Sequence, residues 1–235
     1  MSLRYDDKSK LVQEVFNKVY DKYDLMNDIM SLGTHRIWKQ NLISWINPRK
    51  NNKILDVASG TGDIAKICSH NTNNSCEITC VEPNENMLLE GKKKLKSINN
   101  IKWVLASAED LPFKNDTFDY YVISFGIRNV TNLDKSLNEA YRVLKNGGRF
   151  FCLEFSKVEN EILKNIYKKY SQLIPSIGKL ITGNNMPYNY LVQSIDKFYN
   201  QNELSQKLID KRFNNVEYRN LTNGIAAIHS GWKIE

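Results

Sequence analysis

The stretch Ile54-Leu-Asp-Val-Ala-Ser-Gly-Thr-Gly-Asp63 holds the residue types best suited to chemistry in this chain. A short apolar run breaks there into a turn with two glycines, and a helical pattern follows. Gly60 and Gly62 permit backbone dihedrals that are closed to other residues, and they leave no side chain between the main chain and a ligand. The turn therefore predicts a nucleoside site, with Asp56, Gly60 and Gly62 among its residues.

A carboxylate ends the next apolar run, Ile78-Thr-Cys-Val-Glu82. An acidic side chain at the end of the second strand suits the two hydroxyl groups of a ribose, as in dinucleotide-binding folds. Taken alone, the glycine turn is as consistent with a simple strand-to-helix connection as with a ligand site. Glu82 at this position favours the ligand site.

The turn also distinguishes between two classes of nucleoside ligand. Dinucleotide sites use G-x-G-x-x-G, and the third glycine is missing here, because Asp63, Ile64 and Ala65 follow Gly62. An acidic residue at the start of a helix repels a pyrophosphate, but it accepts hydrogen bonds from an ammonium group. S-adenosylmethionine has a ribose, no phosphate and a cationic amino-acid end, so it fits this turn better than NAD.

Two further segments follow strand-like runs and carry polar residues. An arginine lies directly after a strand-like run in the segment Ser124-Phe-Gly-Ile-Arg128-Asn129. Its side chain stays charged and can hold a phenolate oxygen in its ionised form. The alternative is a surface arginine in a solvated loop. Ser107-Ala-Glu-Asp-Leu-Pro-Phe113 offers a backbone amide and a small side chain to an adenine edge.

A polar cluster lies within the otherwise apolar N-terminal segment. The cluster includes Asp24, and a cluster of this kind is usually a solvated face. Tyr23 and Asn27 argue partly against that, because they are four residues apart and share a helix face beside the apolar stripe at Val19. His35 is more typical of a hydrogen-bonded structural histidine than of a base. The three histidines are far apart in the sequence, which makes a metal site unfavoured, and we expect no metal.

Five strand-like runs alternate with helix-like stretches, which predicts an α/β fold with a mostly parallel sheet and helices on both faces. Two more strands joined by a Thr-Asn-Gly turn predict an antiparallel hairpin at the sheet edge. Asn146-Gly147-Gly148 is expected to cap the helix that precedes the fifth strand. The predicted strands are 53–57, 78–82, 102–106, 120–124, 149–155, 213–220 and 225–232.

We interpret residues 1–235 as a single domain with two additions to its core. Residues 51–156 form the predicted cofactor-binding core, and residues 201–235 form the edge strands. The additions are an N-terminal helical segment, 1–50, and a helical lid or substrate insert, 157–200, both expected over the carboxyl ends of the strands. Residues 160–182 have apolar residues at helical spacing, and Pro175 is expected to kink or divide that helix.

The amino-acid composition indicates in which compartment the protein works and which kinds of partner suit it. Lysine and arginine exceed aspartate and glutamate by 33 to 26, and the net charge of +7 favours an anionic surface such as a membrane leaflet, or simply solubility. The lysines are dispersed, so we expect no nucleic-acid partner. The spacing of the four cysteines indicates free thiols in a reducing compartment. No targeting or membrane-spanning segment is recognisable in the sequence, so we expect a cytoplasmic protein or a processed form.

Two long segments, 23–38 and 142–156, closely resemble the signature segments of the ubiquinone/menaquinone biosynthesis C-methyltransferases, the UbiE family. Residues 125–130 and 221–232 are similar to that family as well. The resemblance implies a class I methyltransferase fold and S-adenosylmethionine contacts at Thr61, Glu82, Ser107, Ala108 and Ser124. Glu82 stands where the family usually has aspartate.

The resemblance also implies the reaction, which is methyl transfer to a ring carbon of a polyprenylated quinol. The ring is then 2-methoxy-6-polyprenyl-1,4-benzoquinol, demethylmenaquinol or both. We expect Arg128 to favour the phenolate directly or through a water, Asn129 and Tyr23 to fix the ring, and Asp24 or His35 to act as base. Expected partners are the quinol, the inner membrane face, quinone-pathway enzymes and a second copy of the chain. Alternatives are a methyltransferase for a soluble small molecule and a non-catalytic assembly partner.

Overall fold

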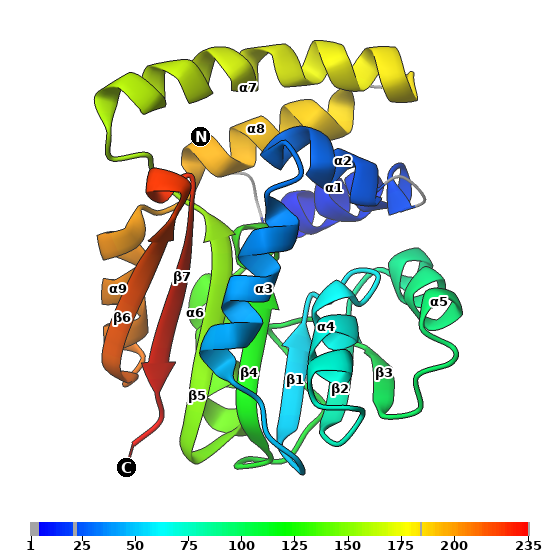
Figure 1. The fold of residues 1–235 in the computed structure, drawn as a ribbon, viewed down its shortest axis with the longest axis vertical. Helices are drawn as coiled ribbons and strands as arrows, with labels where there is room; N and C mark the ends of the chain where they lie inside the picture. The colour runs from blue at the N-terminus through cyan, green and yellow to red at the C-terminus, as the bar shows by residue number, and fades with distance from the viewer. Residues whose placement is uncertain (1–4, 21–22, 184, 235) are drawn as a thin grey trace.

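A seven-stranded mixed sheet forms the centre of the part of the chain that the structure describes, with strand order β3-β2-β1-β4-β5-β7-β6 (Figure 1). The structure is a computed structural model and describes residues 5–20, 23–183 and 185–234. The strands are β1 Lys53–Val57, β2 Glu77–Glu82, β3 Ile101–Leu105, β4 Phe118–Ser124, β5 Leu144–Phe155, β6 Asn214–Leu221 and β7 Ala226–Trp232.

Strands β1 to β5 are parallel, and β7 runs antiparallel to both of its neighbours, β5 and β6. The predicted fold class and the predicted edge hairpin are therefore confirmed. The helices are α1 Tyr5–Asn17, α2 Tyr23–Ser31, α3 His35–Ile46, α4 Asp63–Asn71, α5 Glu85–Lys94, α6 Leu133–Val143, α7 Glu161–Thr182, α8 Met186–Lys197 and α9 Gln201–Asp210, with the short 3-10 helices η2 Ile127–Asn129 and η3 Thr222–Gly224.

Alternating side chains of the strands build two cores, one on each face of the sheet. Ile54 in β1 packs in the core that α3 and α4 cover, whereas its neighbour Leu55 packs in the core that α6 and α9 cover. Successive residues of a strand point to opposite faces, so a strand buried on both faces has a continuous apolar sequence. This explains why β1 and β4 carry almost uninterrupted apolar runs.

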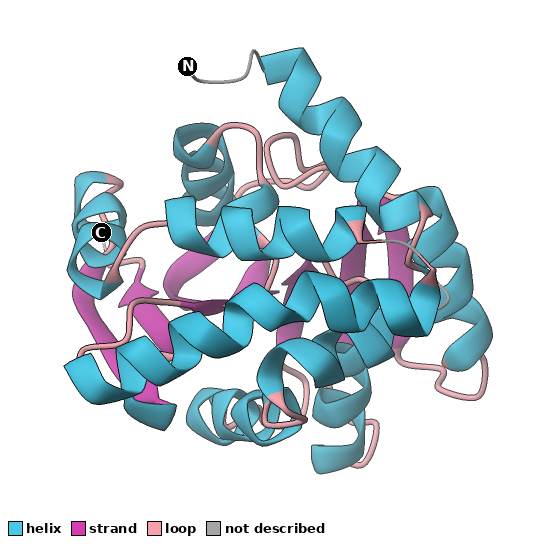
Figure 2. Ribbon diagram, turned by 90° about the horizontal axis from the view of Figure 1, so that it is seen from above, coloured by secondary structure: helices cyan, strands magenta, loops and turns pink. Residues whose placement is uncertain are grey.

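Helices α1, α2, α7 and α8 lie across the edge of the sheet where the parallel strands end (Figure 1). In the view from above, α7 and α8 cross the sheet side by side (Figure 2). Tyr170 in α7 donates a hydrogen bond from its hydroxyl group to the Ile29 carbonyl oxygen of α2, which joins the two added segments. A ligand bound at the carboxyl ends of the strands would therefore be covered by these helices.

The predicted division of the helix at Pro175 is wrong, and so is the predicted helix cap at residues 146–148. Helix α7 continues through Pro175 as one element of 22 residues, because it packs along α8, where Gly178 lies against the ring of Tyr188. Helix α6 ends at Val143, and its C-cap Leu144 already has extended dihedrals. Gly147 instead lies within β5, with φ at +78° and its N–H donating to the Lys233 carbonyl oxygen.

Across the described residues, none of the helices combines the length and the apolar character needed to cross a bilayer.

Candidate functional site

A cavity of about 190 Å³ lies between α1 and the carboxyl ends of the strands. Of the residues predicted to bind the cofactor, Gly60, Glu82, Ser107 and Ala108 line this cavity. They come from the turn after β1, the end of β2 and the loop after β3. The topology of the sheet thus brings together residues that are far apart in the sequence, from Gly60 to Ala108.

The carboxylate of Glu82 is fixed at the cavity wall by two backbone amides. Its Oε2 accepts from the Gly60 N–H at 2.8 Å, and its Oε1 accepts from the Asn84 N–H at 2.9 Å. Burial raises the pKa of Glu82 to about 7, and both amides oppose that rise. A carboxylate can accept about four hydrogen bonds, so acceptor capacity remains for the two hydroxyl groups of a ribose.

Helix α1 forms the opposite wall of the cavity through Val12 and Phe16. Polar contacts attach the helix to the loops below it. Lys8 Nζ donates to the carbonyl oxygens of Arg128 at 3.2 Å and Val130 at 2.5 Å, while Gln13 Nε2 donates to the Pro83 carbonyl oxygen at 3.1 Å. The N-terminal segment therefore completes a pocket that the sheet alone would leave open.

A second, much smaller chamber of about 20 Å³ adjoins the cavity, and Ala58 and Phe125 line both spaces. Asp56, Thr61 and Ser124, also predicted to bind the cofactor, line this chamber. Gly62 lines neither space, since it forms the N-cap of α4 with φ at +87°.

Two buried polar atoms in the small chamber have no hydrogen-bond partner in the part of the chain that the structure describes. Among the described residues, neither Asp56 Oδ2 nor Ser124 Oγ has a hydrogen-bond partner, although Asp56 is only 1% exposed. Burial raises the pKa of Asp56 to about 8. Unpartnered buried polar atoms of this kind are rare in proteins, and these two are available to bond a polar ligand.

The polar groups that line the two spaces match the two ends of S-adenosylmethionine. The larger cavity offers apolar walls and the carboxylate of Glu82 to an adenosine, and the chamber offers Asp56 and Asp63 to an ammonium group. The wall that the spaces share, at Ala58 and Phe125, is where the sulfur would lie between those two ends.

Arg128 lies behind the cavity wall in a buried ion pair. Its Nη1 donates to Glu154 Oε1 at 2.6 Å and to the Phe125 carbonyl oxygen at 2.7 Å, and the two charged side chains are 4% and 2% exposed. Asn129 does line the cavity, and its Oδ1 accepts from the Tyr190 hydroxyl group at 3.0 Å. The structure thus places one of these two predicted residues at the cavity and the other beside it.

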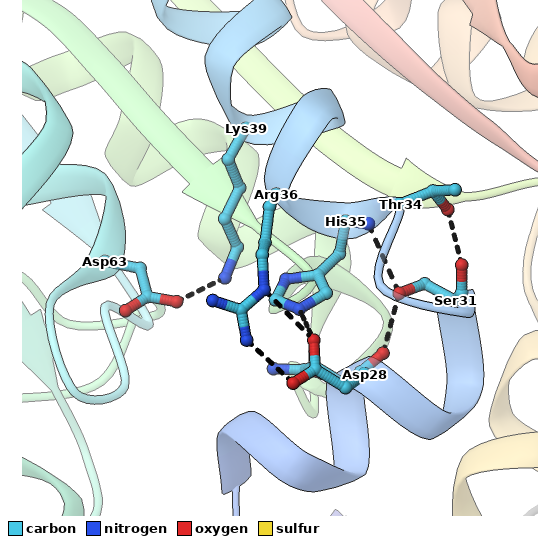
Figure 3. Close-up of polar contacts among 8 residues, drawn as sticks. Asp28, Ser31, Thr34, His35, Arg36, Lys39 and Asp63 are labelled. Carbon is cyan, nitrogen blue, oxygen red and sulfur yellow. Dashed lines mark hydrogen bonds and ion pairs between the residues drawn. The ribbon is translucent and has the colours of Figure 1, made fainter.

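His35 lies at a different opening. Its Nε2 is 2.9 Å from Asp28 Oδ1, and Arg36 holds the same carboxylate through Nη2 at 2.7 Å (Figure 3). Burial lowers the pKa of His35. It lines a groove of about 550 Å³ on the outer side of Lys39 and Asp63, and it is not among the residues that line the cavity. The side chains of Tyr23 and Asp24 lie outside the described residues.

Sequence reasoning gave no role to three polar residues around these spaces. Glu154 and Tyr190 hold Arg128 and Asn129, and Lys39 lines the small chamber. Lys39 could have been found, because it follows His35 by four residues and precedes Leu42 by three, on the buried face of α3. A lysine on an apolar stripe needs a partner, and that need is a signal.

Comparison with known proteins agrees with this geometry. The sequence profile of the ubiE/COQ5 methyltransferase family matches residues 4–233. The "Ubiquinone/menaquinone biosynthesis C-methyltransferase UbiE" of Rickettsia bellii (strain OSU 85-389) is 50% identical over 99% of this chain and 96% of its own. The protein of the same name from Rickettsia akari is 51% identical over 98% of this chain and 95% of its own.

Solved structures share the fold at low identity. A Thermotoga maritima SAM-dependent methyltransferase, described as a possible histamine N-methyltransferase, has a TM-score of 0.69 at 17% identity and covers 94% of this chain and 99% of its own. A Haemonchus contortus phosphoethanolamine N-methyltransferase, solved with S-adenosyl-L-methionine, has a TM-score of 0.65 at 14% identity over 84% of this chain and 52% of its own. The chain belongs to the ubiE/COQ5 methyltransferase family and is a methyltransferase that uses S-adenosylmethionine.

Proposed function

We propose that this chain methylates a ring carbon of a polyprenylated quinol, namely 2-methoxy-6-polyprenyl-1,4-benzoquinol, demethylmenaquinol or both. One observation carries the proposal. Relatives named for ubiquinone and menaquinone biosynthesis align with nearly the whole chain at about half identity, including the added helices that cover the site. Those helices, rather than the shared core, would contact the substrate.

Methylation of a ring carbon requires an electron-rich ring. The bound cofactor supplies a methyl group on a positively charged sulfur, which a carbon attacks. A quinol carbon becomes a sufficient nucleophile when an adjacent hydroxyl group loses its proton and the oxygen donates charge into the ring. The chain must therefore hold the ring beside the cofactor and favour its phenolate form.

Asn129 and Arg128 are the residues that we assign to these two tasks. Asn129 lies at the cavity wall, where its amide can hydrogen-bond a ring oxygen while Tyr190 holds its Oδ1. Arg128 is adjacent, behind the cavity wall, and from there its guanidinium group favours a phenolate through its charge or through an ordered water, in surroundings of low dielectric constant. Glu154 keeps that guanidinium in place through its 2.6 Å ion pair.

The base that accepts the proton is assigned less directly. We propose Asp24 as the base, with Tyr23 fixing the ring; both residues belong to α2, the helix that lies over the strand ends (Figure 1). His35 is the weaker candidate, since its ring is held by Asp28 and faces the outer groove. A pH profile of turnover for the Asp24→Asn and His35→Asn variants distinguishes the two.

A polyprenyl substrate partitions into membranes, so we further propose that the chain touches a membrane surface, the inner membrane face, through α7. Ile162 and Leu180 of this helix are 74% and 87% exposed, and Ile166 and Leu173 lie on the same stripe. Lysines flank the stripe and suit anionic lipid headgroups. Quinone-pathway enzymes or a second copy of the chain are the other partners that we propose for this surface.

A substrate assay tests the proposal against its alternatives. The purified chain is incubated with labelled S-adenosylmethionine and either short-chain quinols of both ring types or a polar metabolite extract. We expect label in the quinol ring only. Label in a polar metabolite would favour a soluble substrate, and cofactor binding without any transfer would favour an assembly partner.

A further inference from the structure

The small chamber contains a charge that nothing in the core fold supplies. Lys39 belongs to α3, before the first strand, and it is 5% exposed. Its Nζ lies 2.6 Å from Asp63 Oδ2, at the start of α4 (Figure 3). A buried lysine loses most of its hydration, so it is found where a partner of opposite charge stays close.

This ion pair separates the chamber from the outer groove. Both Lys39 and Asp63 line both spaces, while Asp56 and Ser124 lie on the inner side only. Asp63 is more accessible than its partner, with side-chain exposures of 36% and 7%. The ammonium group of Lys39 is thus held inward, within electrostatic reach of Asp56, and its charge opposes the rise in the pKa of that carboxyl.

The amino-acid end of the cofactor is a zwitterion, with an ammonium and a carboxylate on the same carbon. An ion pair of the protein is complementary to this zwitterion when the two dipoles are antiparallel, so that each charge of the ligand faces a charge of opposite sign. The chamber supplies acidic groups for the ammonium in Asp56 and Asp63, and Lys39 is the basic side chain that lines it. A carboxylate placed there without a cation would lie next to two acids.

We propose that Lys39 binds the carboxylate of the amino-acid end of S-adenosylmethionine and thereby selects ligands that carry this group. The inference needs the cofactor alone and does not depend on the quinol substrate. On binding, the Lys39 ammonium group gives part of its interaction with Asp63 to the ligand carboxylate, and Asp63 turns to the ligand ammonium. The N-terminal segment therefore contributes to cofactor recognition at both ends, through α1 at the adenosine and through α3 at the amino acid.

Calorimetric titration with two ligands tests the assignment. The first is S-adenosylhomocysteine, and the second is aminopropylthio-adenosine, which is the same molecule without its carboxylate. We expect the wild type to bind the first at least ~10-fold more tightly, the ratio that one charge-assisted hydrogen bond supplies. In Lys39→Met this ratio should fall to about one, because only the carboxylate-bearing ligand loses affinity.

Two further variants serve as controls. Lys39→Arg keeps the charge and should retain most of the preference for the carboxylate. Lys66→Met removes an exposed lysine from the outer groove and should leave both affinities within about twofold of the wild type. Equal loss of both ligands in Lys39→Met would assign the lysine a structural role and overturn the proposal. A wild-type ratio below about twofold would overturn it too, even if Lys39→Met failed to fold.

Discussion

Glu82 and Gly60 are joined by a hydrogen bond of 2.8 Å from the glycine N–H to the carboxylate oxygen. The acid at the end of β2 is thus oriented by the turn after β1, on the neighbouring strand. Glycine at 60 has φ at +58°, a region that favours glycine. The two most informative sequence features of the chain are therefore parts of one structure.

Glu82→Gln should weaken binding of S-adenosylhomocysteine by about 10-fold to 100-fold, measured by calorimetry. The amide would present an N–H₂ group to either the Gly60 or the Asn84 N–H, and one acceptor for the ribose would be lost. The matched control is Glu85→Gln, an exposed residue in the first turn of α5. An unchanged affinity in Glu82→Gln would show that Glu82 does not bind the ribose.

Asp56→Asn should change how stability depends on pH. Burial raises the pKa of Asp56 from 3.8 to about 8, so between these values only the unfolded chain releases the proton. The unfolded state then binds fewer protons than the folded state, and wild-type stability falls as the pH rises through this window. The variant lacks this loss.

Urea denaturation of both proteins between pH 5 and pH 8 measures this effect, with buffers chosen to keep ionic strength constant. The stability of Asp56→Asn relative to the wild type should increase steadily with pH. Glu82, whose pKa burial also raises, is present in both proteins, and the part of its titration that is coupled to Asp56 is included in the measured difference. Curves that stay parallel over the window would contradict the prediction.

Arg128→Ala should abolish most turnover while cofactor affinity stays nearly intact, because Arg128 lies behind the cavity wall rather than at the cofactor residues. The variant also leaves Glu154 buried without its cation, which should cost roughly 3–5 kcal/mol of unfolding free energy. Chemical denaturation and calorimetry measure the two effects separately. Arg128→Ala combined with Glu154→Gln should recover much of the stability and none of the activity.

Leu180→Ser combined with Ile162→Ser should reduce flotation of the protein with vesicles of mixed phosphatidylcholine and phosphatidylglycerol. Both side chains are largely exposed, so the thermal midpoint should stay within a few degrees of the wild-type value. Leu204→Ser, a residue of α9 that is buried in the core, is the contrasting variant and should lower the midpoint. Full flotation of the double variant would exclude the stripe on α7 as the membrane contact.

The sequence was most informative where local pattern and chemistry coincide. At the β1 run, the glycine turn and Glu82, the strand propensity, the apolar pattern and the side-chain chemistry all indicate the same site. The structure places Gly60 and Glu82 at one cavity. Pro175 shows the limit of local reasoning, because packing of α7 on α8 outweighs the cost of one proline in the helix. The predicted cap at Gly147 failed for a similar reason, since that glycine pairs with the distant residue Lys233.

The least predictable parts of the site depend on contacts between distant segments. Glu154 lies 26 residues from Arg128 and Tyr190 lies 61 residues from Asn129, and no periodicity links such pairs. A buried charge predicts a partner of opposite charge, but the sequence does not show which residue provides it. The roles of the remaining predicted residues stay predictions until they are measured.

The hydrogen bonds from Lys8 to the carbonyl oxygens of Arg128 and Val130 attach α1 to the loop after β4, which bears on the rate of turnover. An adenosine bound in the cavity would lie against Val12 and Phe16 of α1, so we expect release of the product cofactor to involve movement of that helix. The rate of each catalytic cycle would then depend on a helix that lies far along the chain from the loops after β3 and β4 that line the same cavity.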